Sequence, residues 1–120
     1  MKPSEIIKHV AMQVGIDPNV AIIEAHKRLQ QPGEIMIQHD DSLMYYKKIG
    51  NMSAAVYFIS ADSALSMVSA ISYFKKKLKQ VGVQMIYMNT QNKQMIEALK
   101  TAGIKMVPSN IQQYHLMARI

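Results

Sequence analysis

A strand that runs directly into a long helix is the stretch of this sequence best placed to bind a ligand. Residues 56–60 are typical of a strand, and residues 63–80 place apolar side chains at helical spacing. Asp62, in the short break between them, is predicted to cap the helix by accepting a backbone N–H hydrogen bond. Because the first N–H groups of a helix attract anions, this junction is a candidate anion-binding site, and the residue pattern leaves open whether it binds one.

Four side chains are candidates for a general base: Glu34, His39, Tyr87 and His115. Each also has a purely structural interpretation. Glu34, His39 and His115 could be solvated residues at strand edges, and Tyr87 could be a core aromatic. The sequence therefore leaves the catalytic residue unassigned. The four histidines show no His-x-x-x-His spacing, so no metal site is expected.

Four lysines cluster in residues 75–79, near the end of the predicted long helix, in a chain of net charge +6. Two interpretations are open. Cations at this position complement the negative end of the helix dipole. They could also form a patch for nucleic acid or another polyanion. No arginines interleave with aromatic residues here, so nucleic acid is not expected among the partners.

The chain of 120 residues is long enough for one domain with its own core. It contains no cysteine, which excludes disulfides, thiolate metal sites and cysteine nucleophiles. No apolar run approaches the roughly 20 residues of a membrane span. The first residues also lack the apolar segment of a signal peptide. We therefore expect one cytoplasmic domain, residues 1–120, with no membrane partner.

Hydrophobic periodicity predicts ten elements in the order α-α-β-β-β-α-β-α-β-β, an α/β (α+β) fold with a mixed sheet. Ser4 is the expected N-cap of the first helix, and Asp17 followed by Pro18 begins the second. A strand, a helix and a strand in succession imply that the two strands are parallel. Helices are expected at residues 5–14, 18–30, 63–80 and 91–102, and strands at 34–39, 42–49, 52–60, 83–88, 104–107 and 112–120.

This order resembles the GCN5-related N-acetyltransferase (GNAT) fold, which has a helix pair, an antiparallel meander, a strand–helix–strand core and a C-terminal hairpin. The resemblance covers essentially the whole chain, except that the first family strand, before the helix pair, is missing. The sharpest match lies in residues 89–104, where Asn92 follows a strand and the next helix ends in Leu99-Lys100-Thr101-Ala102-Gly103. The resemblance implies acetyl-CoA as cofactor, with Asn92 at the position of the family asparagine.

The loop that holds the coenzyme A pyrophosphate departs from the family pattern. Family members carry Arg/Gln-x-x-Gly-x-Gly/Ala there, because the backbone must approach the phosphates closely. This chain instead has Ser60-Ala61-Asp62-Ser63-Ala64-Leu65-Ser66, with no glycine, no basic residue and a carboxylate that would repel a pyrophosphate. The family tyrosine that protonates the leaving thiolate corresponds to Leu99. The resemblance thus implies a degenerate acetyl-CoA motif, whose candidate cofactor-binding residues are Ser60, Ser63, Ser66 and Asn92.

The same departures resemble small GNAT-like proteins of tailed bacteriophages. That resemblance implies weak or lost catalysis and a structural, assembly or binding role, with a phage or host protein as partner and the host cytoplasm or the virion as location. Two alternatives stay open: an active N-acyltransferase with an atypical cofactor loop, and a polyanion-binding module that uses residues 75–79. Apolar residues on the final strand leave open a homodimer formed along a strand edge.

Overall fold

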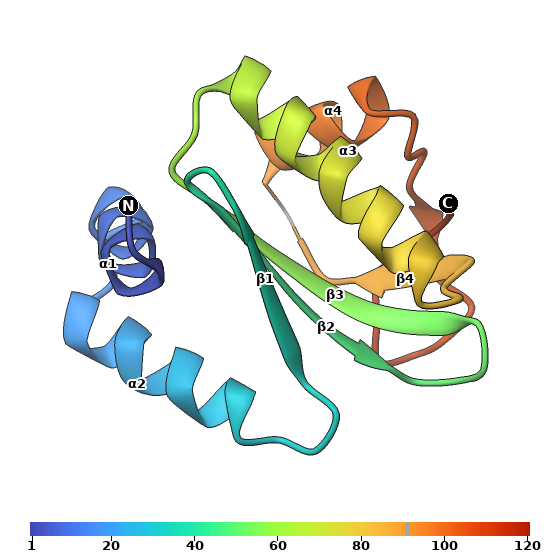
Figure 1. The fold of residues 1–120 in the computed structure, drawn as a ribbon, viewed down its shortest axis with the longest axis horizontal. Helices are drawn as coiled ribbons and strands as arrows, with labels where there is room; N and C mark the ends of the chain where they lie inside the picture. The colour runs from blue at the N-terminus through green and yellow to red at the C-terminus, as the bar shows by residue number, and fades with distance from the viewer. Residues whose placement is uncertain (91) are drawn as a thin grey trace.

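Among residues 1–90 and 92–120, which the computed structural model describes, six strands form one mixed sheet between two pairs of helices (Figure 1). Helices α1 and α2 lie on one face of the sheet, and α3 and α4 lie together on the other. The elements are α1 (Pro3–Gln13), α2 (Pro18–Leu29), β1 (Ile35–His39), β2 (Ser42–Lys48), β3 (Ser53–Ser60), α3 (Ala64–Gln80), β4 (Met85–Met88), α4 (Lys93–Thr101), β5 (Val107–Pro108) and β6 (Leu116–Arg119). This is the order predicted from the sequence.

Alternation along β2 divides the core between the two faces of the sheet. Leu43 and Tyr45 are buried in a cluster with α1, whereas Met44 and Tyr46 belong to a larger cluster with α3 and α4. Successive side chains of a strand point to opposite faces, so one strand supplies both clusters.

The strand order in the sheet is β1-β2-β3-β4-β6-β5. β1, β2 and β3 form the predicted antiparallel meander, and β3 pairs with β4 in parallel. β6 lies between β4 and β5, where Leu116 pairs with both Met88 and Pro108. β5 therefore pairs with Leu116 and Met117 of the final strand, on the side away from β4. The homodimer stays a prediction.

The first helix begins earlier than predicted. α1 starts at Pro3, with Lys2 as its N-cap, so Ser4 lies inside the helix rather than at its start. The backbone N–H of Lys2 donates to the Glu5 carboxylate over 3.0 Å. Proline fits the first turn because its missing N–H would have no helical partner there.

The last two strands are shorter than predicted, because local hydrogen bonds take residues at their starts. Ile104 is buried, and its N–H donates to the carbonyl of Leu99 across Gly103, whose φ of +84° is typical of a helix C-terminus. Ile104 thus belongs to the hydrogen-bonded cap that follows α4 and does not begin a strand. Before β6, the Ser109 hydroxyl accepts from the N–H of Ile111, which makes a turn of the segment. The helix expected from residue 91 begins at Lys93, and residue 91 itself lies outside the described residues.

Candidate functional site

β3 and β4 separate toward their carboxyl ends. In the described part of the chain, parallel pairing joins residues 53–55 of β3 to residues 85–87 of β4, while β3 continues to Ser60. α3 follows β3 and α4 follows β4, so two helix N-termini lie beyond the point where the strands diverge (Figure 1). In open sheets, ligands bind outside the carboxyl ends of such strands. Ser60, Ser63, Ser66 and Asn92 all lie at these two strand–helix junctions.

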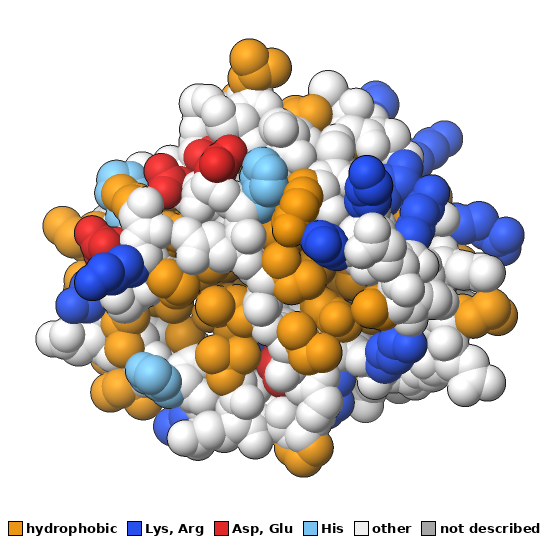
Figure 2. Space-filling model, viewed as in Figure 1, with side chains coloured by type: hydrophobic (Ala, Val, Ile, Leu, Met, Phe, Trp, Pro, Cys, Tyr) orange, Lys and Arg blue, Asp and Glu red, His pale blue; other side chains and the backbone are white. Residues whose placement is uncertain are grey.

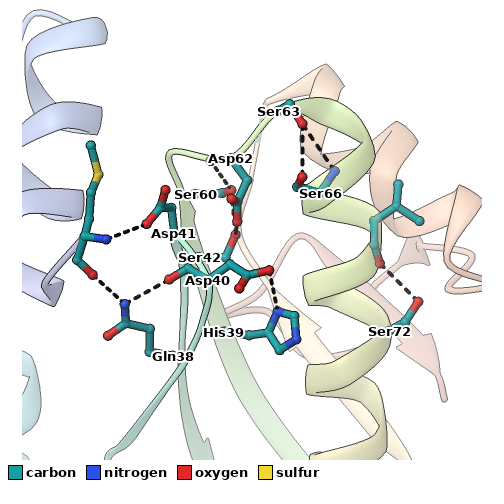
Figure 3. Close-up of polar contacts among 12 residues, drawn as sticks. Gln38, His39, Asp40, Asp41, Ser42, Ser60, Asp62, Ser63, Ser66 and Ser72 are labelled. Carbon is teal, nitrogen blue, oxygen red and sulfur yellow. Dashed lines mark hydrogen bonds and ion pairs between the residues drawn. The ribbon is translucent and has the colours of Figure 1, made fainter.

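A closed ring of hydrogen bonds holds the end of β3 (Figure 3). The Ser42 hydroxyl donates to Asp62 Oδ2 over 2.6 Å and lies 2.7 Å from the Ser60 hydroxyl. The backbone N–H of Asp62 donates to Ser60 Oγ over 3.1 Å. Because a hydroxyl has one proton, and that of Ser42 goes to Asp62, Ser60 must donate its proton to Ser42. Neither serine therefore keeps a proton for another ligand in this arrangement.

The sequence predicted that Asp62 caps α3, and this prediction is wrong. The ring explains why. The Asp62 carboxylate accepts from Ser42, and Ser63 takes the N-cap position. Ser63 Oγ accepts from the N–H of Ser66 at 3.4 Å, and its hydroxyl lies 3.2 Å from that of Ser66. A helix start leaves four N–H groups without helical partners. Ser63 satisfies that of Ser66, and the N–H groups of Ala64 and Leu65, earlier in the first turn, have no partner within the helix.

Three carboxylates lie on the side of this helix start that faces the β1–β2 turn (Figure 3). Asp40 and Asp41 form the β1–β2 turn beside Asp62. The N-terminal ammonium of Met1 lies 2.8 Å from Asp41, and this hydrogen bond, with the opposite charge, raises the pKa of the ammonium. Asp40 lies 3.5 Å from Nδ1 of His39. Since like charges repel, a pyrophosphate approaching the α3 amides would meet these carboxylates.

Asn92 has a structural task in this conformation. Its side-chain oxygen accepts from the N–H groups of Gln94 and Met95 at 3.0 and 3.2 Å and so caps α4. A cofactor contact through that oxygen would compete with the cap. Leu99, at the position of the family tyrosine, is 0% exposed and packs in the core, so this position offers no polar atom to a ligand.

The four candidate bases lie in different surroundings. Glu34 lies near Arg28, and His39 stacks on Tyr73 with ring centroids 4.4 Å apart. The Tyr87 hydroxyl donates to the Asn110 side chain over 3.1 Å. The backbone N–H of His115, an exposed residue, donates to the Asn89 side chain. No hydrogen bond, ion pair or ring contact in the described residues joins any two of the four.

A hollow that the sequence did not predict lies between α1, α2 and the sheet. It has a volume of about 430 Å³ and is mostly apolar, and both Tyr45 and Tyr57 line it. The Arg28 guanidinium lies 4.5 Å from the Tyr57 ring centre and 5.8 Å from that of Tyr45. Its Nη1 is 3.6 Å from the Glu34 carboxylate, whose side chain is 5% exposed. Burial raises the pKa of Tyr45, an effect that the positive charge of Arg28 opposes.

That hollow can hold a largely apolar group beside one balanced pair of charges. Helical spacing places Arg28 on the surface of α2, and strand alternation places Tyr45 and Tyr57 on one face, but neither pattern indicates that the three meet. Ser42 was likewise missed. The register of β2 against β3 sets it opposite Ser60, a pairing that only the two hairpin turns could have suggested.

Comparison with solved structures shows which fold this is. The chain superposes on Tetrahymena GCN5 with a TM-score of 0.60 at 13% identity, covering 98% of this chain and 86% of that one. An aminoglycoside 6'-acetyltransferase type Ii gives a TM-score of 0.63 at 13% identity, with 98% and 88% coverage. The Campylobacter jejuni N-acetyltransferase PseH, in complex with acetyl coenzyme A, gives 0.58 at 10% identity, with 100% and 92% coverage. The chain has the GNAT fold.

Sequence comparison adds no further relative of this GNAT-fold chain. No protein-family model matches the sequence. No curated protein matches it either. The chain spans 65% of the length of a GNAT-family protein from Chromobacterium violaceum, which it matches with a TM-score of 0.57 at 10% identity. At such identities the likeness shows the fold alone. The chemistry has to be argued from the residues of this chain.

Two structural findings limit other kinds of site in this GNAT-fold chain. Residues 1–90 and 92–120 bring no three histidine or acidic side chains together in a way that could hold a metal ion. No helix in the same residues is long and apolar enough to cross a membrane.

Proposed function

We propose that this protein is a GNAT-shaped binding protein in which acetyl transfer is weak or lost. The observation that carries the proposal is the ring of Ser42, Ser60 and Asp62. It holds a carboxylate at the start of α3, where family members present glycine amides to a pyrophosphate. The negative charge opposes coenzyme binding, and the hydroxyl of Ser60 is already used.

Two further features support weak catalysis. Leu99 is buried where a proton donor would be needed, and Asn92 is occupied as the cap of α4. The resemblance to small phage GNAT-like proteins supports a structural or assembly role with a phage or host protein, in the host cytoplasm or the virion.

The second candidate function is an active N-acyltransferase with an atypical cofactor loop. It is supported by the end of the parallel pairing of β3 with β4 and by the first amides of α3, which could still hold an anion. Ser63 and Ser66 would then add hydroxyl groups, and Asn92 would contact acetyl-CoA from α4. The Campylobacter neighbour, whose structure contains acetyl coenzyme A, is an example of this fold holding that cofactor.

Calorimetric titration with acetyl-CoA distinguishes the two functions. We expect a dissociation constant weaker than about 1 mM. A thermal-shift measurement provides a check, because a ligand at about 100 times its dissociation constant stabilises the folded state by roughly 2.7 kcal/mol. Micromolar binding together with acetylation of an amine would reject the proposal in favour of the active enzyme.

Asp62→Asn tests the electrostatic reasoning directly. Two unit charges about 4 Å apart in water repel by roughly 1 kcal/mol. Removing the Asp62 charge should therefore tighten coenzyme binding about fivefold. Asp17→Asn is the matched control, because it removes the same charge at the start of α2 and leaves a good N-cap residue. Equal effects of the two variants would show that net charge, and not the position of Asp62, limits binding.

A further inference from the structure

Charge is divided unevenly along the chain, beyond what the lysine run alone suggests. Residues 63–120 contain eight of the fourteen lysines and arginines but only one of the eight acidic residues, Glu97. Residues 1–62 contain six basic and seven acidic residues. The positive net charge of the protein therefore belongs to α3 and everything after it.

The fold gathers part of this charge on α3 and the loop after α4. A Cβ atom at Gly103 would lie 3.5 Å from Nζ of Lys75, so Lys75 reaches from α3 to that loop. The N–H of Gly103 donates to the carbonyl of Lys100, and the exposed Lys105 follows two residues later. Figure 2 shows lysine and arginine side chains crowded over this side of the molecule, with the acidic side chains mainly on the opposite side.

A second contact extends the charge along α3. Lys79, one turn after Lys75, lines the same pocket of about 380 Å³ as Arg119 of β6. Residues four apart on a helix lie on one face. Lys75, Lys79, Lys100, Lys105 and Arg119 thus form a basic band from the loop after α4 to the end of the final strand.

The band carries charge that the rest of the molecule does not neutralise. In residues 1–90 and 92–120, the ion pairs join Met1 to Asp41, Lys27 to Glu24, Arg28 to Glu34 and His39 to Asp40, and none includes a residue of the band. Cations that have no ion-pair partner among the described residues are available to a partner with many negative charges, and uncompensated charges of one sign attract such a partner at long range.

We propose that the basic band binds the phosphate backbone of a nucleic acid, without reading its sequence. Lysines act as point charges that suit a regular row of phosphates, whereas sequence readout would need side chains that reach base edges. This function goes beyond coenzyme binding and uses a different surface. It also reverses the expectation from the sequence that nucleic acid is not among the partners. That expectation considered residues 75–79 alone, where no arginines interleave with aromatic residues.

A membrane surface fits the band less well. Helices that bind at a lipid surface combine basic and apolar side chains on the same segment. Here five exposed large apolar residues lie together on α1, α2 and their connection, on the other face of the sheet: Met12, Val14, Ile16, Val20 and Ile23. The basic band and this apolar surface cannot meet one flat membrane together.

The test compares two triple variants of equal net charge in a fluorescence anisotropy titration with a labelled random-sequence DNA duplex. Lys79→Gln, Lys105→Gln and Arg119→Gln together remove three charges from the band. Lys2→Gln, Lys8→Gln and Lys27→Gln remove three from α1, its N-cap and α2. We expect wild-type binding to weaken with salt between about 50 and 200 mM, with a log–log slope of about 0.9 per phosphate contacted.

The band variant should bind at least tenfold more weakly at low salt and should lose about 0.9 of slope for each contact removed. The control should stay within about twofold of wild type. Equal losses in both variants, no binding by the wild-type protein at about 50 mM salt, or binding to anionic vesicles but not to DNA would overturn the proposal. Circular dichroism checks folding. If the triple variant unfolds, the double variant Lys79→Gln with Lys105→Gln is used instead. Its DNA affinity must be weaker than that of wild type, by less than the loss expected for the triple variant.

Discussion

Replacing Ser42 with alanine tests the ring at the start of α3. Ser42 is 3% exposed and is the donor through which the Asp62 carboxylate is bound to β2. Alanine removes that hydrogen bond and leaves both the carboxylate and the Ser60 hydroxyl without their partner. A hydrogen bond to a charged group contributes about 1.5–3 kcal/mol, so we expect the free energy of unfolding to fall by about 2 kcal/mol.

That loss converts into a measurable change of melting temperature. Unfolding entropy is about 2.1 cal/mol/K per residue, or about 250 cal/mol/K for a chain of this length, so 2 kcal/mol lowers the midpoint by about 8 °C. Thermal denaturation followed by circular dichroism gives this value, and urea denaturation gives the free energy independently. The double variant with Ser60→Ala should lose less than the sum of the two single changes, because the residues share one ring.

Ser72→Ala is the matched control for Ser42→Ala. The Ser72 hydroxyl is exposed and donates to the Val68 carbonyl of its own helix, so its loss should change stability by less than about 0.5 kcal/mol. If Ser42→Ala is no more destabilising than Ser72→Ala, the ring does not hold Asp62. In that case the carboxylate is free to turn away from an incoming pyrophosphate, and the main argument for weak coenzyme binding is refuted.

Three more predictions follow from single contacts. Asn92→Ala should cost about 1 kcal/mol in thermal denaturation by removing the cap of α4, and Asn92→Asp should restore most of it; no loss would show that the cap is unimportant. Leu99→Ala should cost about 2–5 kcal/mol in urea denaturation because the side chain is fully buried, whereas a surface position would lose little. Burial raises the pKa of Tyr45, so the unfolded chain releases this proton first and stability should fall as the pH rises above about 10. Tyr45→Phe should reduce that fall, and identical alkaline profiles would contradict the assignment.

Local patterns predicted the elements well where one residue dominates the chemistry. Asp17 caps α2, with its carboxylate accepting from the N–H of Asn19, as its position before a proline predicted. At the start of α3 the predicted cap was wrong because a partner distant in sequence competed. Asp62 is a good cap by residue type, yet Ser42, which lies twenty positions earlier, provides a donor that draws it to β2.

The sequence by itself determined the order of helices and strands, the two-faced core of β2 and the departures from the family cofactor loop. These depend on hydrophobic period, turn residues and residue type, all of which act over a few positions. Tertiary structure alone decided that Ser42, Ser60 and Asp62 close a ring and that Lys79 and Arg119 share one pocket. Both groupings arise from strand register and from the packing of α3 beside β4 and β6, which bring residues far apart in the chain into contact. A local pattern contains no information about such contacts, and these contacts determine which ligands the surfaces can bind.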